Sequence, residues 1–288
     1  MASSDWRPLA TPDTLRERAK ILRSLRHYLD ARGVLEVQTP MIGQHTVTDP
    51  DVQAIVVDGY GYLQTSAEYF MKRLLMAGVG DCYQMAPVFR HEENGRLHSS
   101  EFTMLEWYRV GMDASELMEE VASLCDCILG AAEYGTLDYD SLVGHLKGPR
   151  DELDLAFAEA CAGLKGRWFI VNYPADQAAL ARVYKDRPDY AARFELVIDG
   201  VEIANGYWEL TDPAIHRDRF AADLQERQAR SDTLPQVDES FLTALEHGLP
   251  DCSGVAVGVD RLVMLALGFD AVREVMTFST PPFRVNKH

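Results

Sequence analysis

The sequence has no long hydrophobic run and no recognisable export signal. The apolar run at residues 262–267 is far shorter than the roughly 20 residues that a membrane span requires. The first six residues also lack the charged-then-apolar pattern of a secretory signal. We therefore expect a cytoplasmic protein that makes no contact with a membrane.

Cysteine is scarce, and the common metal and phosphate motifs are missing. The five cysteines are odd in number and form no Cys-x-x-Cys pair, and the eight histidines include no His-Glu-x-x-His sequence. This pattern indicates reduced, buried thiols instead of a disulfide framework or a zinc site. A Walker loop and a Gly-x-Gly-x-x-Gly sequence are also absent.

Positive charge is in short supply as well. Lysine and arginine together number 28 against 45 aspartates and glutamates, which gives a net charge of −17. A surface this acidic repels a nucleic acid backbone, so we expect no direct binding of tRNA or DNA. ATP is also an anion, and its binding would need local positive charge from Arg90, Arg96, Arg261 and divalent cations.

What is present fits an ordinary globular enzyme. The 288 residues are 47% hydrophobic and 25% charged, enough for one large core. Strand patterns interleave with hairpins and peripheral helices, which favours an α+β fold with a largely antiparallel β-sheet flanked by helices. We expect a single domain over residues 1–288, with a small helical insertion at about 135–165.

Local signals place the expected elements. Thr11 and Pro12 begin a helix that ends by Gly33. Further helices are expected at 67–77, 114–129 and 213–230. Strands are expected at 34–37, 52–57, 60–63, 168–173 and 194–198, and Asp199 with Gly200 should make a tight turn into the strand at 202–204.

Residues 89–108 carry the most informative pattern, a hairpin with a polar loop. Alternation in its second strand puts Phe102, Met104, Glu106 and Tyr108 on one face. A ring, a carboxylate and a phenol on one face, with Arg90 near the loop, suit an adenine, an amine and a phosphate. Periodicity alone leaves an ordinary amphipathic hairpin with solvated charges as an open alternative.

This segment resembles motif 2 of the class II aminoacyl-tRNA synthetases, which reads Phe-Arg-x-Glu, a loop, then His-x-x-Glu-Phe. Residues 254–262 (Gly-Val-Ala-Val-Gly-Val-Asp-Arg-Leu) resemble motif 3, and residues 33–40 resemble motif 1 more weakly. Thr-Ser-Ala-Glu at 65–68 and Glu-Ile-Ala-Asn-Gly at 202–206 lie between them in order. Together the set is similar to the lysyl branch of the class, and it implies the antiparallel catalytic core of that family.

The resemblance implies an ATP site. Arg90 would hold the α-phosphate and the substrate carboxylate, because a guanidinium meets two oxygens at once. Phe102 would stack on the adenine, and Arg261 would cover its other face or reach the γ-phosphate. Arg90 and Arg261 are thus the expected catalytic residues. The full implied ATP set is Arg90, His91, Glu92, His98, Ser99, Phe102, Glu202, Ile203, Gly258 and Arg261.

The implied amino-acid pocket is acidic. Glu68, Glu106 and Glu209 match the carboxylates with which lysyl enzymes hold a diamino acid. A buried carboxylate is costly unless it is paired, and a cationic substrate would pair it. The remaining implied substrate contacts are Ser66, Ala67, Tyr108, Asn205 and Ala256.

A magnesium site is implied at Glu202 and Glu209. Hard oxygen ligands and bridged phosphates suit this ion. The two residues are seven apart, so a bulge or turn at Asn205 and Gly206 would be needed to direct both side chains to one ion. Two solvated edge-strand carboxylates are the alternative.

Nearly the whole chain resembles the elongation factor P (R)-β-lysine ligases, which are standalone lysyl-type cores. We expect no anticodon-binding domain, and a homodimer through motif 1. The resemblance implies activation of (R)-β-lysine, or weakly of α-lysine, by ATP with Mg²⁺, and transfer of the acyl group to the ε-amine of a lysine on elongation factor P. Ala256 favours this reading, because lysyl-tRNA synthetases have glycine there. A truncated lysyl-tRNA synthetase-like enzyme and a non-catalytic dimeric paralogue remain alternatives.

Overall fold

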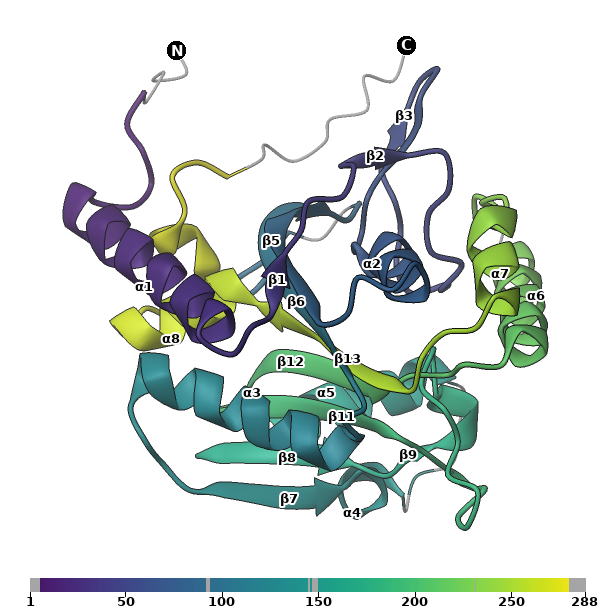
Figure 1. Cartoon of the computed structure of the whole chain (residues 1–288). Coiled ribbons are helices and arrows are strands. Elements are labelled where there is room, and N and C mark those ends of the chain that lie inside the picture. Colours follow the sequence, from purple (N-terminus) through teal and green to yellow (C-terminus); the bar gives the residue numbers. More distant parts are fainter. Residues whose placement is uncertain (1–5, 92–93, 145, 147–149, 231, 280–288) are drawn as a thin grey trace.

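The computed structural model describes residues 6–91, 94–144, 146, 150–230 and 232–279 (Figure 1). Its centre is one eight-stranded sheet, and helices cover both faces of the sheet. Within the described ranges, no helix is long and apolar enough to cross a membrane.

The strands of the large sheet follow the order β1, β5, β6, β13, β12, β11, β8, β7. β1 with β5 and β7 with β8 are parallel, and the other neighbouring pairs are antiparallel. The predicted largely antiparallel sheet is thus confirmed. The bounds are β1 Leu35–Glu36, β5 Cys82–Phe89, β6 Glu101–Val110, β7 Tyr134–Asp138, β8 Arg167–Val171, β11 Arg193–Ile198, β12 Val201–Trp208 and β13 Cys252–Gly258.

Three helices bury the main core against one face of this sheet. They are α1 Pro12–Asp30, α3 Ala114–Leu129 and α8 Val259–Leu267. The Thr11 side chain caps α1, and Asp113 with Glu116 forms a capping box at the start of α3. Leu105 and Trp107, which alternation in the sequence places together, lie fully buried in this core. The opposite face of β6 is therefore left for the site.

A second apolar cluster joins α2 Glu68–Met76, α6 Pro213–Ala229 and α7 Glu239–Glu246 (Figure 1). Its centre is Tyr69 of α2, stacked on Phe241 of α7 with ring centroids 4.5 Å apart. A small sheet of β2 Ile42–Gly43, β4 Gly61–Leu63 and β3 Val56–Val57 precedes α2. The strand predicted at 52–57 is thus only two residues long, and α7 was not predicted.

The segment predicted as a helical insertion at 135–165 begins differently. It starts with the edge strand β7, which pairs with β8, and then forms α4 Tyr139–Val143 and α5 Arg150–Ala162. The strand predicted at 168–173 also divides, because Asn172 adopts a φ of 54° and separates β8 from β9 Tyr173–Pro174. β9 pairs with β10 Tyr190–Ala191, and short 3-10 helices lie at Ala175–Gln177 and Val272–Val275.

The predicted tight turn at Asp199 and Gly200 is confirmed. Both residues have positive φ, 49° and 81°, which is the conformation of the two central residues in a type I′ hairpin turn. This turn joins β11 to β12 and sets their register. Both strands consequently present carboxylates to the same cavity.

Candidate active site

A cavity of about 880 Å³ lies against the face of the large sheet opposite the main core. β6, β12 and β13 form its floor, and residues from α2, α5 and α6 form its walls. Most of the predicted site residues line it. They are Ser66, Glu68, Arg90, His98, Ser99, Phe102, Glu106, Tyr108, Glu202, Ile203, Asn205, Glu209, Ala256, Gly258 and Arg261.

Three predicted site residues are not among those that line the cavity. Ala67 does not line the cavity, but its backbone N–H bonds to the Glu106 carboxylate. His91 does not line the cavity either, and its backbone N–H donates to the Gln53 carbonyl. Glu92 lies outside the described residues.

The exposed face of β6 has the predicted alternation. Phe102, Met104, Glu106 and Tyr108 all line the cavity, while Leu105 and Trp107 point into the core. β13 pairs with this strand so that Gly254 lies opposite Tyr108 and Ala256 opposite Glu106. Motifs 2 and 3 are therefore neighbours in one floor, as two halves of a single pocket.

Both carboxylate oxygens of Glu106 accept hydrogen bonds from neighbouring residues. One oxygen accepts from the Ser66 hydroxyl at 2.8 Å and the other from the Ala67 N–H at 2.9 Å. Burial nevertheless raises the pKa of Glu106 to about 7, and these two hydrogen bonds only partly oppose that effect. The Thr-Ser-Ala-Glu sequence thus serves to orient a carboxylate that is 40 residues away.

Lys72 is a member of this pocket that the sequence analysis missed. Its Nζ lies 2.5 Å from a Glu68 oxygen and 2.6 Å from a Glu209 oxygen. Burial lowers the pKa of Lys72, but Glu209 and Glu68 together raise it above its ordinary value. Burial also raises the pKa of Glu209, and the attraction of Lys72 opposes that rise. Two carboxylates of the acidic pocket are therefore already paired with the Lys72 ammonium group.

Asn205 is a further polar residue that lines the cavity. Asn205 donates from its side-chain nitrogen to the Tyr207 hydroxyl at 3.3 Å. Its side-chain oxygen is buried and has no hydrogen-bond partner within the part of the chain that the structure describes. A ligand N–H could satisfy this acceptor.

The loop end of the hairpin carries the cationic groups. The Arg90 guanidinium carbon lies 5.2 Å from the centre of the Phe102 ring. Across the cavity, Arg261 of α8 donates to the Leu97 carbonyl and to the Glu202 carboxylate, and its Nη2 lies 2.8 Å from the His98 ring. Arg261 thereby connects the motif 2 loop to β12.

Glu202 and Glu209 line the same cavity, but each contacts a different cation, Arg261 or Lys72. Among the described residues, no group of three or more histidines, cysteines, aspartates or glutamates is arranged to hold a metal ion. The irregularity predicted at Asn205 and Gly206 lies earlier, because Leu196 pairs with Ala204 while Val197 pairs with Glu202, so that Ile203 is skipped. The predicted bulge thus exists, but its position was wrong.

Glu195 is another carboxylate that lines the cavity, on the strand next to that of Glu202. It lies on β11 two residues before Val197, the partner of Glu202. Burial raises the pKa of Glu195, Arg193 opposes this, and the charge of Glu202 raises it further. Arg193 donates to Glu195 at 2.6 Å. The sequence contained a signal for this placement. Counting back from the turn at Asp199 and Gly200 pairs Val197 with Glu202, and Glu195, two residues before Val197, lies on the same face of the sheet.

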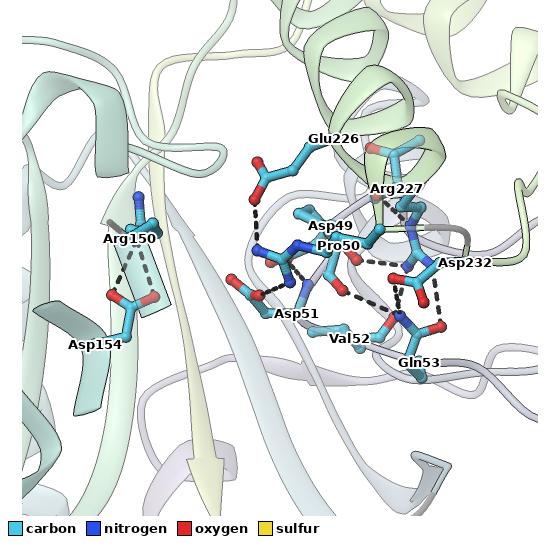
Figure 2. Close-up of polar contacts among 12 residues, drawn as sticks. Asp49, Pro50, Asp51, Val52, Gln53, Arg150, Asp154, Glu226, Arg227 and Asp232 are labelled. Atoms are coloured by element: carbon cyan, nitrogen blue, oxygen red, sulfur yellow. Dashed lines mark hydrogen bonds and ion pairs between the residues drawn. The ribbon is translucent and has the colours of Figure 1, made fainter. Parts of the chain in front are cut away.

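A buried arginine holds one wall of the cavity in place. Figure 2 shows Arg227 of α6 directed at the loop of residues 49–53. Arg150 and Asp154 of α5 lie at the left of the same view. Arg227 donates to the backbone carbonyls of Thr48, Asp49 and Val52, and also to the Gln53 side chain. Both Asp49 and Val52 line the cavity, so this network fixes part of its rim.

Comparison with known proteins agrees with this geometry. The model of the family "tRNA synthetases class II (D, K and N)" matches residues 4–281. A protein of Vibrio cholerae named elongation factor P–(R)-β-lysine ligase is 39% identical over 98% of this chain and 99% of its own length. Proteins with the same name from Proteus mirabilis and Photorhabdus laumondii are 42% and 40% identical, over 96% of this chain and 97% and 98% of their own lengths. By its motifs, its sheet and this match, the chain belongs to the class II tRNA synthetases of the D, K and N family.

Proposed function

We propose that this chain uses ATP to activate (R)-β-lysine, and more weakly α-lysine, and transfers the acyl group to the ε-amine of a lysine on elongation factor P. The observation that carries the proposal is that an acidic pocket, formed by Glu68, Glu106 and Glu209, opens into the same cavity as Arg90 and Phe102. The shared name of the similar ligases from Vibrio, Proteus and Photorhabdus supports the choice of substrate and acceptor.

The acidic end suits the two amines of a diamino acid. Glu106 is fixed by two hydrogen bonds, and Glu68 and Glu209 are fixed by Lys72, so each carboxylate is held ready before a ligand enters. The buried Asn205 oxygen adds a neutral acceptor. An acidic side chain would meet repulsion here, which argues against aspartate as the amino acid.

The nucleotide end suits ATP. In this proposal the adenine stacks on Phe102, and Arg90 holds the α-phosphate and the substrate carboxylate. The carboxylate oxygen then attacks the α-phosphorus in line, the bond to pyrophosphate breaks, and an aminoacyl-adenylate forms. Arg90 takes up the charge that develops on the phosphate oxygens. The chemistry needs no protein nucleophile.

A divalent cation would be held by Glu202 together with Glu195. Both carboxylates line the cavity on neighbouring strands, and the charge of Glu202 acts on Glu195. Such an ion, taken to be Mg²⁺, would neutralise the phosphates of ATP. Glu209 is left to the amine pocket in this assignment, because it shares the Lys72 ammonium group with Glu68.

The experiment is ATP–pyrophosphate exchange with (R)-β-lysine, α-lysine and no amino acid, followed by mass spectrometry of elongation factor P after incubation. We expect exchange with both lysines, faster with (R)-β-lysine, and a mass gain on elongation factor P. The preference should be moderate, because a methyl-sized feature such as Ala256 gives about 1–3 kcal/mol of selectivity. A folded protein that supports neither reaction would refute the proposal. Charging of tRNA instead would favour the lysyl-tRNA synthetase alternative.

A further inference from the structure

We infer that Lys72 is a positioning and specificity residue, which sets the charge of the amino-acid pocket so that it accepts a substrate with two ammonium groups. The inference rests on the proposed function, since it concerns the same pocket. It adds a residue that does not touch the substrate and assigns it control over which substrate charge is accepted.

Lys72 does not occupy the space in which the substrate would bind. Its side chain is 0% exposed, and it is not among the residues that line the cavity, whereas Glu68 and Glu209 are. The ammonium group therefore lies behind the two carboxylates. It binds one oxygen of each, Oε1 of Glu68 and Oε2 of Glu209, and leaves one oxygen of each for a ligand.

The charges of the pocket then balance with those of a diamino acid. Glu68, Glu106 and Glu209 contribute three negative charges and Lys72 one positive charge, so the pocket carries two negative charges when all four groups are ionised. A lysine isomer brings two ammonium groups, and its own carboxylate faces Arg90. Arg182, which also lies close to Glu209, donates to the Glu209 backbone carbonyl and pairs with Asp251.

Removing Lys72 would leave three carboxylates in one buried site. Such a site is costly, and one carboxylate would take up a proton or turn away. A protonated glutamate no longer attracts an ammonium group. The pocket would consequently lose its advantage for a second amine while it kept its shape.

A structural role in α2 alone does not explain the arrangement. Lys20 and Glu17 of α1 form an ordinary exposed pair within one helix. Lys72 makes a similar contact with Glu68 but also reaches Glu209, which directly follows β12. It thereby aligns two carboxylates that come from different elements.

The test compares two amino acids in the exchange assay, α-lysine and 6-hydroxynorleucine, which is α-lysine with a hydroxyl in place of the ε-amine. In Lys72→Met we expect kcat/KM for α-lysine, relative to the hydroxyl analogue, to fall about tenfold or more. The KM for ATP should change little. Lys20→Met removes a lysine from a helical pair far from the cavity and should behave as the wild type.

A second measurement does not need catalysis. Calorimetry compares 1,5-diaminopentane with 1-aminopentane, and the wild type should prefer the diamine while Lys72→Met should lose that preference. If the wild type binds the diamine but exchanges no amino acid, the proposed function fails and the calorimetry still tests Lys72. If Lys72→Met does not fold, Lys72→Gln replaces it, since its amide hydrogen-bonds without a charge.

Three results would overturn the inference. The first is an unchanged ratio between lysine and the hydroxyl analogue in Lys72→Met. The second is an equal loss for both amino acids and for ATP, which would make Lys72 a purely structural residue. The third is a wild-type protein that binds the diamine no better than the monoamine.

Discussion

At the scale of single residues, Glu106 links substrate binding to pH. Burial raises its pKa to about 7, so it is largely neutral below this pH and charged above it. Only the charged form attracts an ammonium group. We therefore expect the KM for the diamino acid to rise as the pH falls below about 7, while the KM for ATP changes little.

The exchange assay between about pH 6 and 9 measures this effect. Thermal unfolding gives an independent check of the direction of the Glu106 pKa shift. The folded chain holds the Glu106 proton more tightly than the unfolded chain, so this group favours folding less as the pH rises from the ordinary carboxyl range to about 7. Glu106→Gln should weaken the pH effect on KM, and the remainder is expected from Glu209, whose pKa burial also raises to about 7. An amino-acid KM that does not vary with pH would contradict the assignment.

Gly254 offers a second prediction at this scale. A Cβ at this position would lie 2.3 Å from the Tyr108 ring and 2.5 Å from a Glu209 oxygen. Neither group can retreat easily, because both are buried. We expect Gly254→Ala to raise the KM for the amino acid about tenfold, since forcing extra volume into a packed site typically costs about 1–3 kcal/mol.

Gly163→Ala is the matched control. Its Cβ would come no closer than 3.4 Å to a neighbouring atom, an ordinary contact. Kinetics and the melting temperature of both variants decide the matter. If Gly254→Ala kept the wild-type KM, the tight packing of Tyr108 and Glu209 would have no part in substrate binding.

Two residues of the site could not be found by motif comparison alone. Lys72 is four residues after Glu68, a spacing common in solvated helices, and only the fold places Glu209 beside it. Glu195 lies outside the family motifs, and only the pairing of β11 with β12 brings it to the face that carries Glu202. By contrast, alternation alone predicted which side chains of β6 would line the cavity.

At the scale of elements, Arg227 attaches α6 to the loop before β3. It is 2% exposed and donates to three backbone carbonyls of that loop. Arg227→Met would leave these acceptors buried without a donor. We expect a loss of about 3 kcal/mol or more in the free energy of unfolding, measured by denaturant titration.

Arg230→Met on the same helix is the comparison. Arg230 is exposed and pairs with Asp51 and Glu226 on the surface. Surface pairs of this kind contribute less than about 1 kcal/mol. Equal losses in the two variants would mean that the buried network is not what holds this wall of the cavity.

The elements themselves were predictable where the local signals were strong. Thr11 with Pro12 predicted the start of α1, and Asp199 with Gly200 predicted the turn of a hairpin. β7 was missed because a five-residue edge strand has a weak pattern. It exists because β8 offers it a partner. Such a contact between distant parts of the chain has no local signature.

At the scale of the whole molecule, β1 is an edge of the large sheet, and Leu35 on it is 53% exposed. We propose that this edge, part of motif 1, meets a second copy of the chain. Leu35→Glu would place a charge at the contact and repel the other copy. We expect sedimentation velocity to find a dimer for the wild type and a weaker dimer for the variant.

Leu155→Glu provides the control. Leu155 lies on α5 and is 63% exposed, so it is a similar exposed leucine on a different element. Its substitution should leave the sedimentation unchanged. A wild-type protein that sediments as a monomer at all concentrations would contradict the proposed dimer.

The contacts of Arg261 have a consequence for the order in which ligands bind. The Nη1 of Arg261 bonds to the Glu202 carboxylate, so the arginine and the carboxylate neutralise each other. A nucleotide phosphate that draws Arg261 away leaves Glu202 with an uncompensated charge, which a divalent cation can take up. Each ligand thus lowers the energetic cost of binding the other. Nucleotide and cation should therefore bind with positive cooperativity.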